Sequence, residues 1–312
     1  MQTKANHQQL HHRTPDGLNL SLRMWGGHGP PQFLLLHGYG DNALVWDHFA
    51  SALGDSCCPL AMDLRGHGHS EWDPRGIYAL PDFVADAVNV LDELCPAPVV
   101  LVGHSLGAQI AMRAAAARRE RIRAVVLVDV ALRANEASGA QVHRKFRERQ
   151  RVYDSAAQYI AFLRGQLPLA RVQLLNVLAE GALRVREDGH CEERCDPMLA
   201  NMDDSIDRLA IMVALKQIAR PILFVRGAGS AVLSRATARE VLTELAQSRV
   251  STVAAAGHTV MLDNPDGFSA AVMQYIGKFS SELMCDADAD RWSRPDRQVR
   301  ELLEPSNRKE TP

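Results

Sequence analysis

Long apolar runs are missing from the sequence. No stretch reaches the roughly 18 consecutive apolar residues that a membrane-spanning helix needs, and the opening segment MQTKANHQQLHHRTPDG lacks the apolar core of a secretion signal. Cysteine is also scarce, because six cysteines in 312 residues are too few for a disulfide framework in a chain of this length. We therefore expect a soluble, cytoplasmic protein with a large apolar core.

An excess of charge of either sign is lacking as well. The 35 basic and 37 acidic residues give a formal net charge of −2, so we expect neither nucleic acid nor a membrane as a partner. The 12 histidines are scattered and form no metal-spaced pair on one helix face. Cys191 and Cys195 lie beside His190 in a charged segment with no second pair. We expect no metal and no cofactor.

The order of apolar and polar residues predicts an α/β protein. Alternating segments at residues 8–13 and 18–25 flank the turn signal PDG and predict an N-terminal β-hairpin. Short apolar strands then alternate with amphipathic helices, which is typical of a mostly parallel, doubly wound sheet covered on both faces. Strands are expected at residues 32–37, 58–63, 98–104, 122–129, 221–225 and 249–253, and helices at residues 43–53, 80–94, 106–118, 235–246 and 266–280.

The alternation stops between residues 131 and 217. This segment has helical periodicity, many arginines and no convincing strand. A helical insertion between two halves of an α/β sheet is typical of a cap over an active site. We therefore expect an α/β core at residues 1–130 and 218–281, a helical cap at 131–217 and a charged C-terminal tail at 282–312.

The segment PVVLVGHSLGAQIAMRAA places one serine between a buried strand and a helix. Ser105 can point into the crevice at the end of the sheet only if the backbone turns sharply, which crowds the positions two before and two after it. Gly103 and Gly107 occupy both positions, and the helix that starts at Leu106 directs free N–H groups toward the serine. This context predicts that Ser105 is a nucleophile.

A serine nucleophile also needs donors for the oxyanion that forms during acyl transfer. The N–H group of Leu106 is one candidate. The segment FLLLHGYGDNALVW follows the strand at 32–37, and Gly38 lets this loop approach the site closely. We predict the N–H group of Tyr39 as the second donor.

Four motifs together resemble the α/β-hydrolase family over about residues 8–280. They are LLLHGYGDNALVW, MDLRGHGHS, VVLVGHSLGAQIAMRAA and VAAAGHTVMLDNPDGF, in this order and at plausible spacings. The resemblance implies an α/β-hydrolase fold and a serine hydrolase with a helical cap.

His258 in the last motif is the expected base. It follows the last strand and precedes Pro265 and the final helix, and Gly257 frees the loop to bring the imidazole to Ser105. A neutral imidazole can accept the serine proton and return it to the leaving group, and the resemblance gives His258 the same role. His104 is nearer in the sequence, but a neighbour of the nucleophile on a tight turn points away from it.

The acid is expected at an unusual position. In many members of the resembled family it follows the first strand after the cap, but Gly229-Ser230-Ala231 offers no carboxylate there. Asp129 ends the strand before the cap, where some relatives carry the acid, including certain amide hydrolases and cofactor-free dioxygenases. We therefore predict Asp129 as the acid, with a structural role at the corner of the cap as the alternative.

The other carboxylates near these motifs are expected to be structural. Asp63 fits a loop-organising role tied to Arg65 or to turn amides. Asp263 and Asp266 follow His258 too closely to orient its ring and are expected to cap the last helix. If Asp129 is not the acid, Asp63 is the next candidate.

Basic residues recur over the predicted cap, ten of them between residues 133 and 186. The run at residues 144–151 is typical of a solvated helix face, but an arginine turned inward would select a substrate that bears a carboxylate. They are Arg133, Arg144, Lys145, Arg147, Arg149, Arg151, Arg164, Arg171, Arg184 and Arg186.

Three functions remain open from the sequence. The first is a serine hydrolase that cleaves a small-molecule ester, lactone, thioester or amide through Ser105, His258 and Asp129. The second is a cofactor-free dioxygenase or lyase in which His258 and Asp129 act as the base. The third is a catalytically silent ligand binder, which the absence of a carboxylate at residues 229–231 suggests.

Overall fold

The protein has a central sheet of eight strands in a computed structural model that describes residues 7–27, 29–54, 57–133, 136–203 and 205–277. The strand order is β1-β2-β4-β3-β5-β6-β10-β11; β1 and β2 are antiparallel to their neighbours and the others are parallel. The strands are β1 (His7–Arg13), β2 (Asn19–Trp25), β3 (Phe33–Leu36), β4 (Pro59–Met62), β5 (Val99–His104), β6 (Ile122–Val128), β10 (Ile222–Gly227) and β11 (Ser248–Val253). The predicted tail lies outside the described residues.

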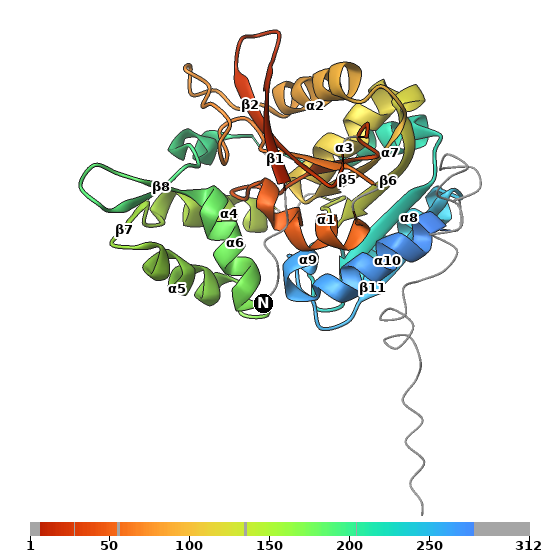
Figure 1. The fold of residues 1–312 in the computed structure, drawn as a ribbon. Helices are drawn as coiled ribbons and strands as arrows, with labels where there is room; N and C mark the ends of the chain where they lie inside the picture. The colour runs from red at the N-terminus through yellow and green to blue at the C-terminus, as the bar shows by residue number, and fades with distance from the viewer. Residues whose placement is uncertain (1–6, 28, 55–56, 134–135, 204, 278–312) are drawn as a thin grey trace, which may run out of the picture.

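Helices cover both faces of this sheet, so the predicted doubly wound fold is confirmed (Figure 1). Successive side chains of a strand point to opposite faces, and each face of β3 to β10 is apolar. On one face, Leu34 and Leu101 pack with α2 (Leu80–Leu94), α3 (Leu106–Ala117), α7 (Arg208–Ile218) and α8 (Arg235–Glu244). On the other, Leu35 and Val102 pack with α1 (Asp47–Leu53), α9 (Val260–Asp263) and α10 (Pro265–Gly277).

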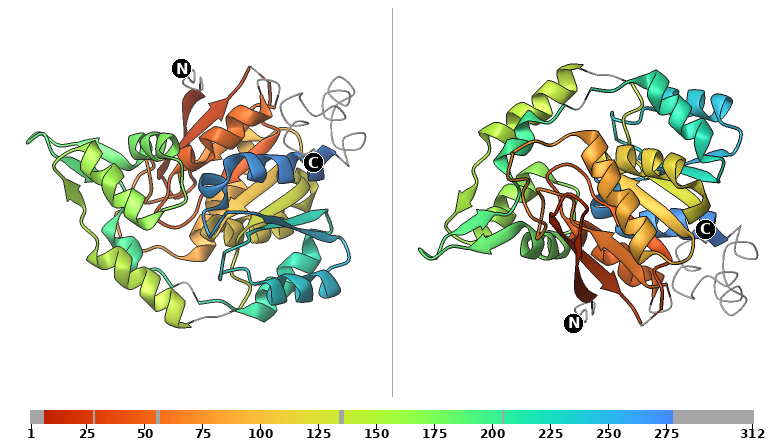
Figure 2. Two further views of the ribbon diagram at one scale, coloured as in Figure 1. Left: turned by 90° about the horizontal axis from the view of Figure 1, so that it is seen from below. Right: turned by 90° about the horizontal axis from the view of Figure 1, so that it is seen from above.

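The segment predicted as a helical cap lies beside the core in every view (Figures 1 and 2). It contains α4 (Glu136–Glu148), α5 (Ala156–Gln166), α6 (Val172–Ala182) and the 3-10 helix η3 (Pro197–Asn201). It also contains a small antiparallel sheet of β7 (Val152–Tyr153), β9 (Cys191–Glu193) and β8 (Leu183–Val185). The expectation of a strand-free insertion was therefore wrong. Strands of two or three residues are too short to show an alternating pattern.

The last helix before the sheet resumes, α7, falls within the range predicted for the cap but packs on the core. Its apolar face, which includes Ile211 and Leu215, lies with α3 against the sheet. The cap elements proper therefore end before α7. Within the described residues, no helix combines the length and the apolar character needed to cross a membrane.

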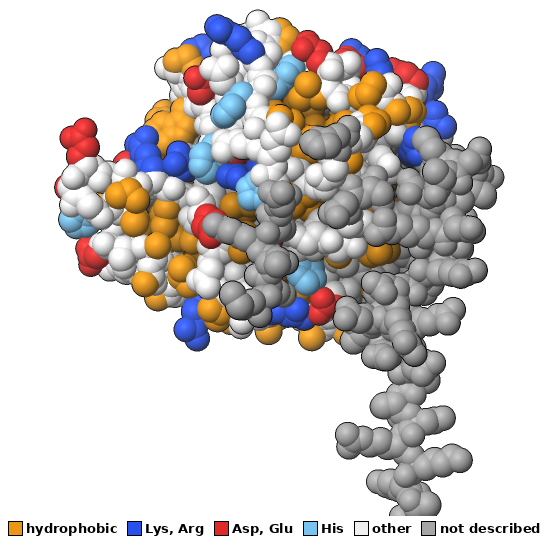
Figure 3. Space-filling view, viewed as in Figure 1, with side chains coloured by type: hydrophobic (Ala, Val, Ile, Leu, Met, Phe, Trp, Pro, Cys, Tyr) orange, Lys and Arg blue, Asp and Glu red, His pale blue; other side chains and the backbone are white. Residues whose placement is uncertain are grey.

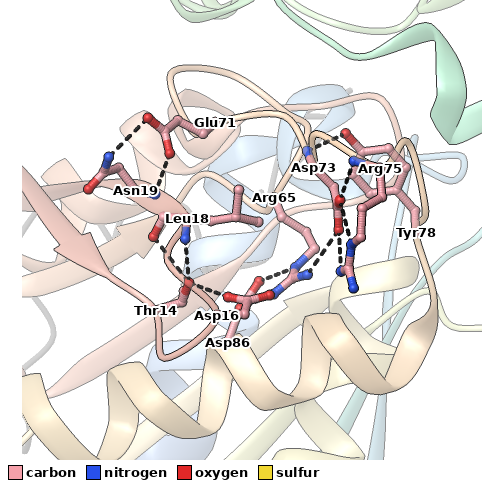
Figure 4. A network of polar contacts seen from close by, with 10 residues as sticks. All are labelled: Thr14, Asp16, Leu18, Asn19, Arg65, Glu71, Asp73, Arg75, Tyr78 and Asp86. Carbon is pink, nitrogen blue, oxygen red and sulfur yellow. Dashed lines mark hydrogen bonds and ion pairs between the residues drawn. The ribbon is translucent and has the colours of Figure 1, made fainter.

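The loop after β4 is fixed by a buried arginine (Figure 4). Arg65 donates from Nε and Nη2 to the two carboxylate oxygens of Asp86 on α2, at 2.6 Å each, and from Nη2 to Asp16 in the hairpin turn at 3.1 Å. Its Nη1 lies 3.8 Å from Asp73. Arg65 and Asp86 are each only 2% exposed, so this ion pair ties the hairpin, α2 and the loop together inside the protein.

The described surface in Figure 3 shows basic and acidic side chains interspersed rather than gathered by sign. This distribution agrees with the net charge of −2. A face of this kind lacks the basic stripe with which a protein tracks a phosphate backbone.

The backbone is packed very closely at the turn between β5 and α3. Ser105 has φ 50° and ψ −111°, a left-handed conformation that a non-glycine residue rarely adopts. A Cβ atom on Gly103 would overlap the carbonyl oxygen of Gly107, and one on Gly107 would overlap that of Leu36. The two glycines therefore allow α3 to approach β3 and β5 closely enough to hold Ser105 in this conformation.

We expect Gly107→Ala to lower the free energy of unfolding by about 3 kcal/mol, because backbone atoms of β3 cannot move away from the new methyl group. Urea denaturation of the purified variant measures this loss. Gly165→Ala in α5 is the matched control, because no atom lies within 4 Å of its added Cβ and alanine favours the helix by up to about 1 kcal/mol. Equal stability of the two variants would contradict the close approach at Gly107.

Candidate active site

Three predicted residues from distant parts of the chain meet at the carboxyl end of the sheet. The imidazole of His258, in the loop between β11 and α9, lies between a hydroxyl and a carboxylate. Its Nε2 is 3.1 Å from Ser105 Oγ, and its Nδ1 is 2.7 Å from Asp129 Oδ2. Because Asp129 can only accept when ionised, Nδ1 carries the proton and Nε2 is left to accept from the serine hydroxyl.

Asp129 stands directly after β6, the strand that lies between β5 and β10. Its side chain has no exposed surface, and its N–H group donates to the carbonyl of Val225 at 2.7 Å. Its φ of 43° is also left-handed, so the backbone turns out of the sheet there as it does at Ser105. The adjacency of β5 and β6 brings a carboxylate within reach of an imidazole that also contacts Ser105.

The segment at residues 229–231, which has no carboxylate, contributes a hydroxyl instead. Ser230 donates from Oγ to Asp129 Oδ2, the same oxygen that His258 contacts. The other oxygen, Oδ1, is buried without a hydrogen-bond partner among the described residues. The sequence argument did not single out Ser230, although its place in the segment where many relatives carry the acid was a usable signal. Glu240, the next carboxylate along the chain, lies on α8 and pairs with Arg133.

Three hydrogen bonds hold the loop that carries His258. His104 Nε2 lies 3.0 Å from the carbonyl oxygen of His258 and fixes the backbone of that residue. Asp263 accepts from the N–H group of Gly257 at 2.8 Å and from the hydroxyl of Thr259 at 3.2 Å. Asp263 therefore closes the loop on both sides of His258, and its expected role as a cap of the last helix was wrong.

Asp266 also has a different role from the one expected. It pairs with His48 on α1, at 3.0 Å, and with Arg171 at the start of α6. It therefore links the core to the cap at the surface, and no helix-capping bond from it is present among the described residues.

The loop after β3, residues 37–42, lies directly against the nucleophile. A Cβ atom on Gly38 would be 2.7 Å from His104 Nδ1 and 3.4 Å from Ser105 Cβ, so only glycine fits there. The next N–H group along this loop is that of Tyr39. The N–H group of Leu106, at the first residue of α3, has no acceptor among the described residues. Both predicted oxyanion donors thus stand on backbone segments that flank Ser105.

Asp63 holds the start of η1 (Ala43–Trp46) and the loop after β4. Its Oδ1 accepts from the N–H group of Ala43 at 2.7 Å, and its Oδ2 accepts from that of His69 at 3.0 Å. It is a loop-organising residue tied to turn amides, as predicted, whereas Arg65 pairs with other carboxylates. It does not contact His258.

Two further histidines hold the loop that carries Tyr39 against the core. His37 accepts from the N–H group of Leu64 at 2.9 Å, and His67 accepts from that of Gly40 at 3.1 Å. Burial lowers the pKa of His67 to about 4 and holds the pKa of His37 well below its usual range. Both rings are therefore neutral near pH 7 and can serve as acceptors for these amides.

The cap segment packs on the same loop. The ring of Phe146 lies 4.7 Å from that of Tyr39, and Asn42 Nδ2 donates to the carbonyl of Leu178 on α6 at 3.1 Å. Arg149 and Arg151, just after α4, turn inward and are 17% and 19% exposed. The expectation of a solvated face across residues 144–151 was wrong for these two side chains.

Among the described residues, no group of three or more histidine, cysteine, aspartate or glutamate side chains is arranged to hold a metal ion. The arrangement can support proton transfer between Ser105 and His258, with Asp129 orienting the imidazole and backbone N–H donors beside the serine.

Known proteins resemble this chain in sequence and in fold. The sequence profile of the alpha/beta hydrolase family matches residues 33–271. Esterase Rv0045c of Mycobacterium tuberculosis is 30% identical over an alignment of 269 residues. The alignment covers 79% of this chain and 82% of the esterase. The 2-(acetamidomethylene)succinate hydrolase of Mesorhizobium japonicum is 26% identical over 250 residues, which are 79% of this chain and 88% of that enzyme.

Solved structures agree with these relatives. A structure of the M. tuberculosis esterase matches with a TM-score of 0.75 at 26% identity and covers 88% of this chain and 93% of the esterase. A crystal structure of E-2-(acetamidomethylene)succinate hydrolase has the same fold, with a TM-score of 0.74 at 24% identity over 86% of this chain and 99% of the hydrolase. The chain therefore belongs to the alpha/beta hydrolase family and is a hydrolase.

Proposed function

We propose that this hydrolase cleaves a small-molecule ester, lactone, thioester or amide through an acyl-enzyme on Ser105. One observation carries the proposal: a continuous path of hydrogen-bond distances runs from Ser105 Oγ to His258 Nε2, 3.1 Å, and from His258 Nδ1 to Asp129, 2.7 Å. A nucleophile, a base and an orienting acid in this geometry are the parts that acyl transfer requires.

In the first half of the reaction, Ser105 Oγ attacks the carbonyl carbon of the substrate while His258 Nε2 takes the hydroxyl proton. The carbonyl π electrons move to oxygen, and the N–H groups of Leu106 and Tyr39 stabilise the resulting oxyanion. The intermediate collapses when the bond to the leaving group breaks, and His258 returns the proton to the leaving oxygen, sulfur or nitrogen. Asp129 stabilises the imidazolium between these two transfers.

In the second half, water replaces the leaving group. His258 takes a proton from the water molecule as its oxygen attacks the acyl-enzyme carbonyl. The second tetrahedral intermediate then breaks its bond to Ser105, and the hydroxyl is restored by the proton held on His258. The products are a carboxylic acid and the free enzyme.

The names of the relatives support the substrate range. One relative is an esterase, and another hydrolyses 2-(acetamidomethylene)succinate, a compound with an acetamido group. The same type of site can act on esters and on amides because both reactions pass through a tetrahedral oxyanion. The cap packed on the loop of Tyr39 favours a small substrate enclosed between cap and core.

The two other functions considered from the sequence have weaker support. A dioxygenase or lyase would need only the pair of His258 and Asp129, whereas here the imidazole also contacts the hydroxyl of Ser105. A silent binder was suggested by the missing carboxylate at residues 229–231. That argument loses its basis because Asp129 lies beside His258.

Ser105→Ala is expected to reduce kcat for hydrolysis of a short-chain ester by about 10⁶, because it removes the nucleophile and little else. Initial rates on ethyl butyrate at constant pH measure this loss. The native protein, but not the variant, should also form a covalent adduct with a fluorophosphonate probe, detected by intact mass. Turnover by the variant at more than a few per cent of the native rate would exclude the acyl-enzyme on Ser105.

Asp129→Asn is expected to lower kcat by about 10⁴ while the fold is kept, because an amide at this position favours the wrong imidazole tautomer. Glu240→Gln is the matched control, since it neutralises the nearest carboxylate after residues 229–231 without touching His258. Its kcat should equal that of the native enzyme. Near-normal kcat/KM for Asp129→Asn would show that Asp129 is not the acid.

A further inference from the structure

Arg149 brings a charged side chain from the cap onto the loop of Tyr39. Its Nη2 donates to Glu193 on β9 at 2.7 Å, and its guanidinium lies 4.1 Å from the centre of the Phe146 ring. Its Nη1 is 3.4 Å from the position that a Cβ atom on Gly40 would take, and neither Nη1 nor the buried Nε has a hydrogen-bond acceptor among the described residues. One edge of the guanidinium is therefore committed to Glu193, while the other faces the loop beside the nucleophile.

The charges around Arg149 do not balance. Glu193, which is 2% exposed, is shared by Arg149 and by Arg151, whose Nη1 is 3.3 Å away. Arg151 also donates to two backbone carbonyls, those of Cys195 at 3.0 Å and Phe146 at 3.3 Å. Two guanidiniums with one carboxylate leave an excess positive charge at a site where little water screens it.

Asp41 is the only other nearby carboxyl that the charge of Arg149 reaches within the described part of the site. It lies on the same loop as Gly40, and the charges of Arg149 and His258 both act on it. No hydrogen bond or ion pair to its side chain is present among the described residues. Burial raises the pKa of Asp41 to about 7 despite these two charges, so at neutral pH it compensates Arg149 only in part.

We propose that Arg149 Nη1 binds a free carboxylate of the substrate, which makes this hydrolase selective for small esters or amides that carry one. This inference rests on the serine-hydrolase function proposed above. A guanidinium edge that lacks an acceptor and a surplus of buried positive charge are the features that recognise a carboxylate. An anion from the substrate supplies the acceptor and the countercharge together.

The position of Arg149 limits where the substrate carboxylate lies. A Cβ atom on Gly38 would lie 3.4 Å from Ser105 Cβ, and one on Gly40 would lie 3.4 Å from Arg149 Nη1. Two residues of extended chain span at most about 7 Å, so Ser105 Cβ and Arg149 Nη1 are no more than about 14 Å apart. The carboxylate bound by Arg149 therefore lies within the length of a small substrate from the carbonyl that Ser105 attacks, and a monoester of a short dicarboxylic acid tests this spacing.

The test compares substrates that differ only in the charge of one group. Monoethyl succinate is paired with its neutral carboxamide, ethyl succinamate, and 3-acetoxybenzoate is paired with 3-acetoxybenzamide. The first pair places the carboxylate on the acyl side and the second on the leaving group. We expect the native enzyme to show a kcat/KM at least about tenfold higher for the acid than for the amide in one pair.

Arg149→Gln should abolish that preference, because it lowers kcat/KM for the acid much more than for the neutral amide. Arg151→Gln is the matched control, because it also removes one positive charge beside Glu193 but its donors are bound to the protein. It should retain most of the preference. Arg149→Lys, which keeps the charge and loses the planar fork, should keep part of it.

Asp41 provides an independent measurement. Between pH 6 and pH 8 it becomes ionised next to Arg149 and competes with the substrate carboxylate, so the acid-to-amide ratio of the native enzyme should fall as pH rises. Asp41→Asn should make the ratio independent of pH and higher at pH 8. The charges of His258 and Arg149 affect the pKa of Asp41, and the charge of Asp41 affects the pKa of Tyr159. The ratio isolates Asp41, because Arg149 and Tyr159 keep their charge state in this range.

The outcomes separate this inference from the function on which it rests. A native enzyme that hydrolyses ethyl butyrate and reacts with a fluorophosphonate, but prefers the acid in neither pair, overturns the role of Arg149 and leaves the serine hydrolase intact. That comparison needs no variant to fold. An equal loss on acid and amide in Arg149→Gln would assign the residue to anchoring the cap, and it would also overturn the proposal. Absence of labelling and of turnover would refute the proposed function instead.

Discussion

The left-handed backbone at Ser105 is the constraint on which the rest of the site depends. A side chain at the end of β5 faces the crevice only with this turn, and the turn exists only because α3 lies almost in contact with β3 and β5. Gly103 and Gly107 permit that approach. The cost of an unfavourable φ, on the order of 1–3 kcal/mol, is offset by the apolar burial of α3 against the sheet. The strain is therefore supported by the packing of the core.

Strand order explains why the acid can stand after β6. Because β6 lies between β5 and β10, its carboxyl end is next to the nucleophile, and the loop of His258 reaches across both strand ends. A carboxylate after β10 and one after β6 can serve the same Nδ1 atom. Here Ser230, after β10, donates to Asp129 and occupies the space that a carboxylate would fill from that strand. The residue after β6 and the residue after β10 are thus hydrogen-bonded to each other, although only Asp129 is a carboxylate.

The sheet and the three central side chains could be predicted because each leaves a local mark in the sequence. Strands buried on both faces give continuous apolar runs, and the helix at residues 80–94 was predicted with its observed bounds. The inward orientation of Arg149 leaves no such mark. Arg147 and Arg149 belong to one charged run, and the contacts of Arg149 with Glu193 and with the ring of Phe146 hold its side chain inward. Tertiary contacts decide the orientation of these side chains, so periodicity could not reveal it.

The loop at residues 37–42 joins catalysis to substrate choice. From the core, His67 fixes its backbone at Gly40, and Asp63 fixes the start of the helix that follows. From the cap, Phe146 packs on Tyr39, and the carbonyl of Leu178 accepts from Asn42. A shift of the cap would move two groups at once. One is the N–H group proposed to stabilise the oxyanion, and the other is the guanidinium proposed to bind the substrate. Under the two proposals, recognition of the substrate by the cap acts on the same backbone that stabilises the transition state, so binding energy gained at a remote group of the substrate contributes to the rate of the chemical step.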